Sequence, residues 1–164
     1  YLQHDWFTAR LTYQNYFTRI GPVRLGFRAE ALASTQDLFQ NYVATVVNAP
    51  VFRPIPEART FYLPQFHAHN YAAAGLQAVW LMGNVDLRTE TYVFNPFGIL
   101  RSDAQNQPFY DWAVDPKFIS STSVILHTPI GPESFSANYY EAKAEQWSFI
   151  FTFGYLIFND SVRD

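Results

Sequence analysis

The chain has 164 residues, a net charge of −3 and a charged fraction of 15%, which together exclude a basic nucleic-acid-binding domain. It has no cysteine, so disulfides and thiolate metal sites are excluded. It also has no run of about 18 apolar residues, the length that a transmembrane helix requires. Aromatic residues reach 19% while mean hydropathy is only −0.12, a combination typical of strands with one apolar and one polar face.

The first two predicted strands are residues 5–17 and 23–33, joined by a turn at 19–22. The second alternates most clearly. Val23, Leu25 and Phe27 fall on one face, and Arg24, Arg28 and Glu30 fall on the other. Three charges on one face of a strand would be costly in a closed apolar core. They are natural in the wet lumen of a β-barrel.

A long stretch without alternation follows at residues 34–69 and contains Pro50, Pro54, Pro56 and Pro64. Residues 36–47 are predicted to form a short helix capped by Ser34 or Thr35. A connection of this length is uncommon in a compact domain and is usually functional. We expect an extracellular loop that can fold inward.

The remaining predicted strands are residues 71–81, 85–97, 118–128, 133–141 and 147–158. Tight turns at 82–84 and 129–132 and a short link at 142–146 join three pairs of them, while a second long polar loop spans 98–116. Asp86, Arg88 and Glu90 share one face of the strand at 85–97. The strand at 118–128 is rich in Ser and Thr and alternates weakly.

The last strand carries an unbroken apolar stripe, of which the members are Trp147, Phe149, Phe151, Phe153, Tyr155 and Ile157. In a soluble protein this stripe would need a covering layer, whereas in an outer-membrane barrel it faces lipid. The sequence therefore predicts an all-β fold: an antiparallel transmembrane β-barrel, one domain over residues 1–164, in the bacterial outer membrane.

Loop lengths make a separate argument for a barrel. If the chain end is periplasmic, the short turns near 19–22, 82–84 and 129–132 all fall on the periplasmic side. Both long loops, 34–69 and 98–116, then fall outside, as in outer-membrane barrels. About seven strands are visible, but bacterial barrels have an even number. We therefore expect this segment, which begins at Tyr1 without a signal peptide, to be the C-terminal part of a larger barrel.

Several stretches together resemble the C-terminal barrel of Bacteroidetes-type patatin-like phospholipases, which belong to the surface-antigen group of outer-membrane barrels. The resembling stretches are residues 41–50 with Phe52, Pro54 and Pro56, then 66–76, 86–96, 131–140 and 153–159. The resemblance implies an upstream serine hydrolase with a Gly-x-Ser-x-Gly motif, followed by a small periplasmic module and the barrel. This chain has no such motif, so we expect no enzyme activity in this segment. The expected role is to anchor the upstream domain, and to help translocate it.

The charged positions form one candidate site facing the lumen, made of Arg24, Arg28, Glu30, Asp86, Arg88 and Glu90. They could guide a solute through a pore, or they could fill the lumen and hold the strands in register, and the second interpretation is favoured. His67 and His69 form an i, i+2 pair that could share a metal, although a polar loop end is the simpler interpretation. Ser120, Ser121, Ser123 and His127 lack a Gly-rich oxyanion turn and indicate a polar strand.

No cofactor is expected. The expected partners are outer-membrane lipid, the barrel-assembly machinery and a homo-oligomer or outer-membrane complex, without nucleic acid. Two alternatives stay open: a stand-alone small barrel or assembly subunit that binds through the loop at 34–69, and a soluble lipocalin-like barrel. In the lipocalin-like case the aromatic face would point inward and the charged face outward.

Overall fold

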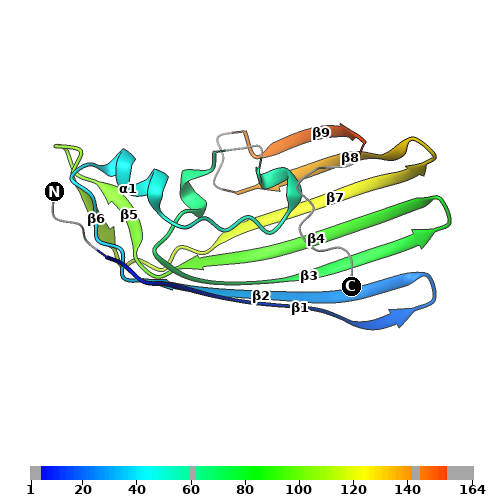
Figure 1. Ribbon diagram of the computed structural model, residues 1–164, viewed down its shortest axis with the longest axis horizontal. Helices are drawn as coiled ribbons and strands as arrows, with labels where there is room; N and C mark the ends of the chain where they lie inside the picture. Colours follow the sequence, from blue (N-terminus) through cyan, green and yellow to red (C-terminus); the bar gives the residue numbers. More distant parts are fainter. Residues whose placement is uncertain (1–4, 60–61, 142–144, 155–164) are drawn as a thin grey trace.

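The computed structural model describes residues 5–59, 62–141 and 145–154, and their fold is the expected all-β, antiparallel one (Figure 1). A seven-stranded meander has the order β1-β2-β3-β4-β7-β8-β9, and β5 and β6 form a separate hairpin. The strand bounds are β1 Thr8–Ile20, β2 Val23–Ser34, β3 Asn70–Met82, β4 Val85–Pro96, β5 Ile99–Ser102, β6 Pro108–Asp111, β7 Lys117–Thr128, β8 Gly131–Tyr140 and β9 Trp147–Phe153. The sheet is curved but not closed, since β1 and β9 are its two edges.

Strand positions follow the predicted alternation closely, with two differences. β1 starts at Thr8 and runs to Ile20, because a bulge between Tyr16 and Thr18 adds a residue and lets the strand continue beyond Phe17. The predicted strand at 147–158 is observed as β9 up to Phe153, and residues 155–158 lie outside the described part of the chain.

The helix falls later than predicted. α1 spans Tyr42–Asn48, and its N-cap is Asn41, whose side-chain oxygen accepts a hydrogen bond from the Ala44 amide at 2.7 Å. The expected cap Thr35 is engaged elsewhere, because its side-chain oxygen accepts a hydrogen bond from the Phe7 amide at 2.9 Å. Two 3-10 turns follow, η1 at Pro56–Arg59 and η2 at Pro64–Phe66. None of the helices in the described ranges is long and apolar enough to cross a membrane.

The two ends of the sheet differ in the way that the loop lengths predicted. The turns after β1, β3 and β7 are all tight and lie at one end, on the right in Figure 1. α1 and the β5–β6 hairpin lie at the opposite end. The predicted loop at 98–116 thus contains the β5–β6 hairpin. Each of its strands has only four residues, too few to show alternation in the sequence.

The core lies between the concave face of the sheet and the segment at residues 50–68, which we call the inward segment. This segment closes on itself, since the Phe52 amide donates to the Phe66 carbonyl at 2.9 Å and the Ala68 amide donates to that of Pro50 at 3.0 Å. Its buried side chains pack on apolar side chains of β2, β3, β4, β7 and β8. The cluster is Leu32, Phe52, Ile55, Ala58, Leu63, Phe66, Ala68, Tyr71, Ala73, Tyr92, Phe94, Ile119 and Tyr140.

Candidate functional site

A buried carboxylate on β2 gathers the first group of polar side chains on the concave face. Arg28 donates to Oε2 of Glu30 at 2.9 Å, and the hydroxyl of Tyr71 on β3 donates to Oε1 at 2.6 Å. Arg10 on β1 approaches the same carboxylate at 3.7 Å. Glu30 thus joins three neighbouring strands, and its charge is balanced without access to bulk water.

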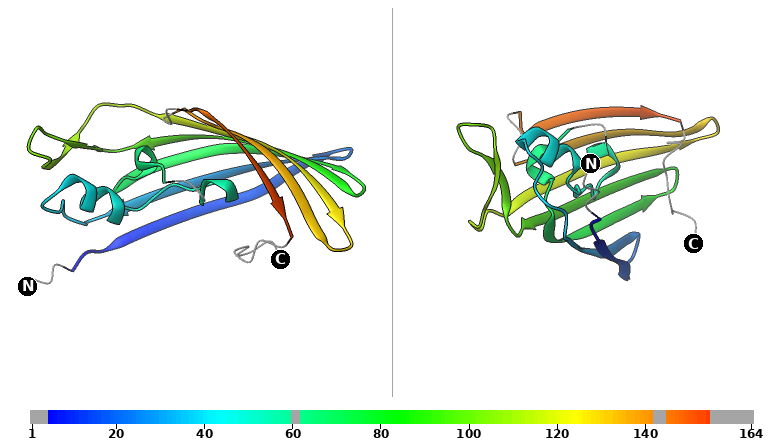
Figure 2. Two further views of the ribbon diagram at one scale, coloured as in Figure 1. Left: turned by 90° about the horizontal axis from the view of Figure 1, so that it is seen from above. Right: turned by 60° about the vertical axis from the view of Figure 1, so that its left-hand side comes forward.

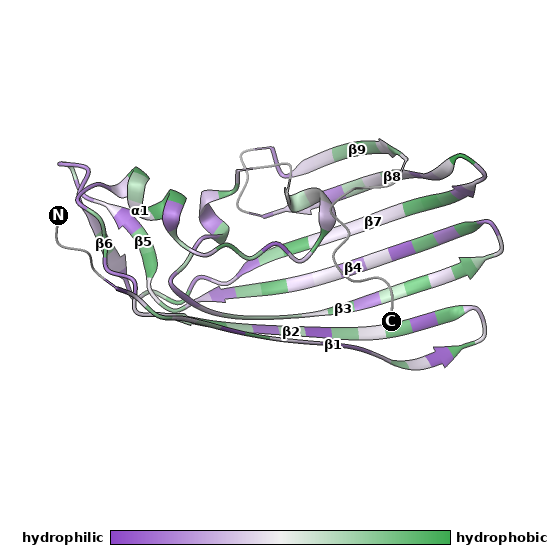
Figure 3. Cartoon of the chain, in the orientation of Figure 1, coloured by the Kyte–Doolittle hydropathy of each residue, from purple (hydrophilic) through white to green (hydrophobic). Residues whose placement is uncertain are grey.

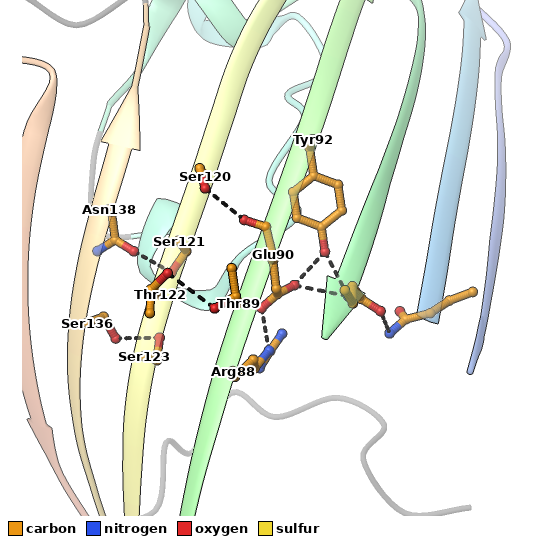
Figure 4. Close-up of polar contacts among 12 residues, drawn as sticks. Arg88, Thr89, Glu90, Tyr92, Ser120, Ser121, Thr122, Ser123, Ser136 and Asn138 are labelled. Atoms are coloured by element: carbon orange, nitrogen blue, oxygen red, sulfur yellow. Dashed lines mark hydrogen bonds and ion pairs between the residues drawn. The ribbon is translucent and has the colours of Figure 1, made fainter. Parts of the chain in front are cut away.

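Glu90 on β4 gathers the second group (Figure 4). This carboxylate is 2% exposed, forms an ion pair with Arg88, and accepts hydrogen bonds from the Tyr92 hydroxyl at 2.5 Å and from the Gln77 amide at 2.9 Å. Gln77 in turn accepts a hydrogen bond from Gln14 of β1 at 3.0 Å. The chain of contacts therefore crosses the sheet from β1 to β4.

Neutral pairs continue this polar belt across β7 and β8. The Ser121 hydroxyl donates to Oδ1 of Asn138 at 2.7 Å, and the Ser123 hydroxyl donates to that of Ser136 at 2.9 Å. All four side chains are buried. Ser121 and Ser123 therefore serve cross-strand pairing, as the interpretation of this stretch as a polar strand requires.

Glycine at position 75 makes room for part of the network. A Cβ at Gly75 would lie 2.2 Å from both the Thr91 carbonyl oxygen and the Tyr92 ring. The register places Gly75 directly opposite Tyr92, so the bare backbone lets the ring lie flat across β3 and direct its hydroxyl to Glu90.

The six predicted charged residues share the concave face by register, but they do not form one cluster. Arg28 with Glu30 and Arg88 with Glu90 are pairs within single strands. Asp86 instead contacts Nε2 of His127 on β7 at 2.7 Å, and Arg24 has no ion pair within the described ranges. Charge pairs between neighbouring strands were the expected means of fixing register. Most cross-strand contacts on this face are instead made by tyrosine, glutamine, serine and asparagine, which the sequence reasoning missed.

The predicted apolar stripe of β9 lies on the opposite face and is exposed. Trp147, Phe149, Phe151 and Phe153 are each 59–66% exposed, while Tyr155 and Ile157 lie outside the described residues. Other strands add to this surface with Leu11, Tyr13, Leu76, Trp80, Val93, Val124, Leu126 and Phe135. The alternation of hydropathy along each strand is visible in Figure 3.

Hydroxyl groups on the apolar face are paired with one another. Thr91 and Ser120 lie 3.1 Å apart across β4 and β7, and Thr89 and Thr122 lie 3.3 Å apart in the same strands. Ser120 also donates to the backbone carbonyl of Glu90. These hydroxyls thus have partners on the protein, which lowers the cost of placing them in an apolar medium.

His67 and His69 are held by separate partners instead of converging. Nδ1 of His67 lies 3.1 Å from the Ala49 carbonyl oxygen, and Nδ1 of His69 lies 2.6 Å from the Tyr110 hydroxyl on β6. Burial lowers the pKa of both imidazoles. Among the described residues, no three His, Cys, Asp or Glu side chains gather in an arrangement that could hold a metal.

Comparison with protein-family models, with curated proteins and with solved structures gives no match. The functional conclusion therefore depends on the two faces of the sheet and on the packing at its ends.

Proposed function

We propose that this chain is the C-terminal part of a bacterial outer-membrane β-barrel, and that its role is to anchor an upstream patatin-like phospholipase domain. The observation that carries the proposal is the exposed apolar face, which runs from β1 to β9, together with the buried polar belt on the opposite face. Soluble antiparallel sheets bury an apolar face and expose a polar one, whereas this sheet exposes a continuous apolar face and buries charged side chains on the other. Hydrocarbon is the solvent in which that arrangement is stable.

Strand length and aromatic positions support the same proposal. β1, β2, β3, β4 and β7 have 12 or 13 residues each, enough to cross a bilayer at a tilt. Trp147 lies at the long-loop end of the apolar face and Trp80 lies near the tight-turn end. Tryptophans at both ends of an apolar band are typical of membrane interfaces.

The open edges support a larger assembly. Both β1 and β9 are edge strands that present unpaired backbone groups along one side, and such groups cannot face hydrocarbon without partners. We infer that further strands complete the barrel, supplied by upstream sequence in the proposed phospholipase. If the protein is instead a homo-oligomer, strands from a second copy would pair with these edges.

The inward segment favours an anchoring role over free conduction. Phe52 packs against Tyr71, Tyr92 and Phe94, with ring centroids 5.5–6.1 Å apart. This packing fills the concave side near the long-loop end with apolar side chains, where a water-filled pore would carry polar ones. The lipocalin-like alternative would require the exposed aromatic face to line an interior, and the curvature of the sheet favours the opposite arrangement (Figure 2).

The test is detergent dependence and assembly of the full-length gene product. We expect membrane extraction only with detergent and a folded band of altered mobility when the sample is not boiled. Arg28→Gln leaves Glu30 with Arg10 and Tyr71, and should keep that band. A full-length protein that is soluble and monomeric without detergent would contradict the proposal.

A further inference from the structure

A cavity of about 270 Å3 lies at the long-loop end, outside the polar belt described above. Its walls come from α1, η2, β5 and the start of β7, which are far apart in sequence. The polar side chains that line it are Tyr42, Gln65, His67, Arg101, Asp115 and Lys117. Cavities with a few convergent polar groups and apolar walls are typical of small-molecule sites, and this volume suits a small ligand.

The walls are fixed by packing before any ligand arrives. Val46 and Ala49 of the α1 region pack with Leu100 of β5 in a second apolar cluster, which Tyr42 and Tyr110 flank. The His69–Tyr110 hydrogen bond ties the β5–β6 hairpin to the start of β3. A site whose walls are already ordered loses little conformational entropy when a ligand binds.

The charges in the cavity are already balanced. Lys117 is paired with Asp115 at 2.5 Å, and Arg101 is paired at 2.6 Å with Asp111 of β6. A strongly charged ligand would have to displace one of these carboxylates. A neutral ligand could instead use the remaining guanidinium and ammonium hydrogens as donors and the free Asp115 lone pairs as acceptors.

The imidazole of His67 is held in one tautomer in the cavity wall. Its Nδ1 faces the Ala49 carbonyl, which can only accept, so Nδ1 carries the proton in the neutral ring. Nε2 is then a buried acceptor, and it has no hydrogen-bond partner in the described part of the chain. This atom has almost no accessible surface, so a ligand in the cavity does not reach it, and the role of His67 is to tie the wall to the end of α1 through Ala49.

From these contacts we propose that the cavity binds a neutral, hydroxyl-rich ligand about the size of one sugar ring. The ligand would accept hydrogen bonds from Arg101 and Lys117, donate to Asp115, and lie against the ring of Tyr42. It could be a free saccharide or a sugar of a membrane glycolipid, since both present the same hydroxyls. The inference does not depend on barrel closure, because residues of this chain alone build the cavity.

The test is calorimetric titration of the full-length protein in detergent with D-glucose, D-galactose, N-acetyl-D-glucosamine and inorganic phosphate. We expect saturable binding of at least one sugar, weakened about tenfold by Arg101→Gln, which is what losing about 1.4 kcal/mol produces. Tyr42→Phe removes the hydroxyl but keeps the ring against which the ligand lies, and should leave binding nearly unchanged. Two further measurements separate a glycolipid from a free saccharide as the ligand. Retention of the protein on lipopolysaccharide-containing vesicles would indicate the glycolipid, and binding of free sugar without such retention would indicate the saccharide.

Arg24→Gln is the matched control, because it removes a guanidinium at the opposite end of the sheet and should leave sugar binding unchanged. Heat-modifiable mobility of the same samples reports barrel assembly separately, so failure of the anchoring proposal and failure of this one are distinguishable. The inference is overturned if no sugar gives saturable binding, if phosphate binds in place of the sugars, or if Arg101→Gln binds as the parent protein does.

Discussion

The two faces of the sheet have opposite relations between polarity and burial. On the apolar face Phe151 is 66% exposed, whereas on the concave face the carboxylate residue Glu90 is 2% exposed. A single strand, β4, contributes to both, with Val93 exposed beside buried Glu90 and Tyr92. If the apolar face meets hydrocarbon, as proposed, the two faces should respond oppositely to the same kind of substitution.

The largest effect is expected on the concave face near the long loops. Phe52→Ala would remove a ring that contacts Tyr71, Tyr92 and Phe94, and should cost about 3–5 kcal/mol. The inward segment would then detach from the sheet. Limited proteolysis should show new cleavage within residues 50–68, and unchanged resistance there would contradict the packing described.

A charge on the apolar face comes next. Phe151→Arg should cost about 2–4 kcal/mol if that face meets hydrocarbon, and should remove the folded band in unboiled gel samples. Phe27→Arg on β2 should act in the same way, while Arg28→Gln on the other face should not. If Arg28→Gln lost the folded band as completely as Phe151→Arg and Phe27→Arg, the assignment of the two faces to different surroundings would be wrong.

Overpacking at a glycine should have a smaller effect. Gly75→Ala places a methyl group 2.2 Å from the Thr91 carbonyl oxygen and the Tyr92 ring, and should destabilise the protein by about 1–3 kcal/mol. Urea titration of the folded band provides the measurement. Ala74→Ser, at the exposed neighbouring position, is the control. If Gly75→Ala were as stable as the parent protein, the close contact at Gly75 would be contradicted.

The smallest effect is a pH dependence of the long-loop end. Burial lowers the pKa of His67 and His69 in the folded protein, so the unfolded chain binds more protons below a pH of about 6.5. The stability contributed by their neutral rings is therefore present above that pH and is lost as the pH falls. Hydrogen exchange of amides in β5 and β6, corrected for intrinsic rates, should accelerate at pH 5 relative to pH 7.5. The same protection at both values would exclude this coupling.

Much of the sheet could be predicted because period-two alternation is a local signal. It located seven strands and separated Arg28 and Glu30 from Phe27. The polar network could not be predicted, because its partners are set by register: Gln77 meets Glu90 only through the β3–β4 pairing. The β5–β6 hairpin and the cavity were also missed, since strands of four residues show little periodicity and the cavity walls are distant in sequence.

The proposal that the apolar face meets lipid is tested most directly by a nitroxide scan along β9. Single cysteines are placed at positions 147–153 of the assembled protein in lipid vesicles and labelled. None of these 164 residues is a cysteine, so within this segment the label attaches only at the introduced position. We predict that labels at 147, 149, 151 and 153 collide with oxygen dissolved in the lipid, and that labels at 148, 150 and 152 do not. Preferential collision of the odd-numbered labels with a water-soluble nickel complex would contradict the assignment of this face to hydrocarbon.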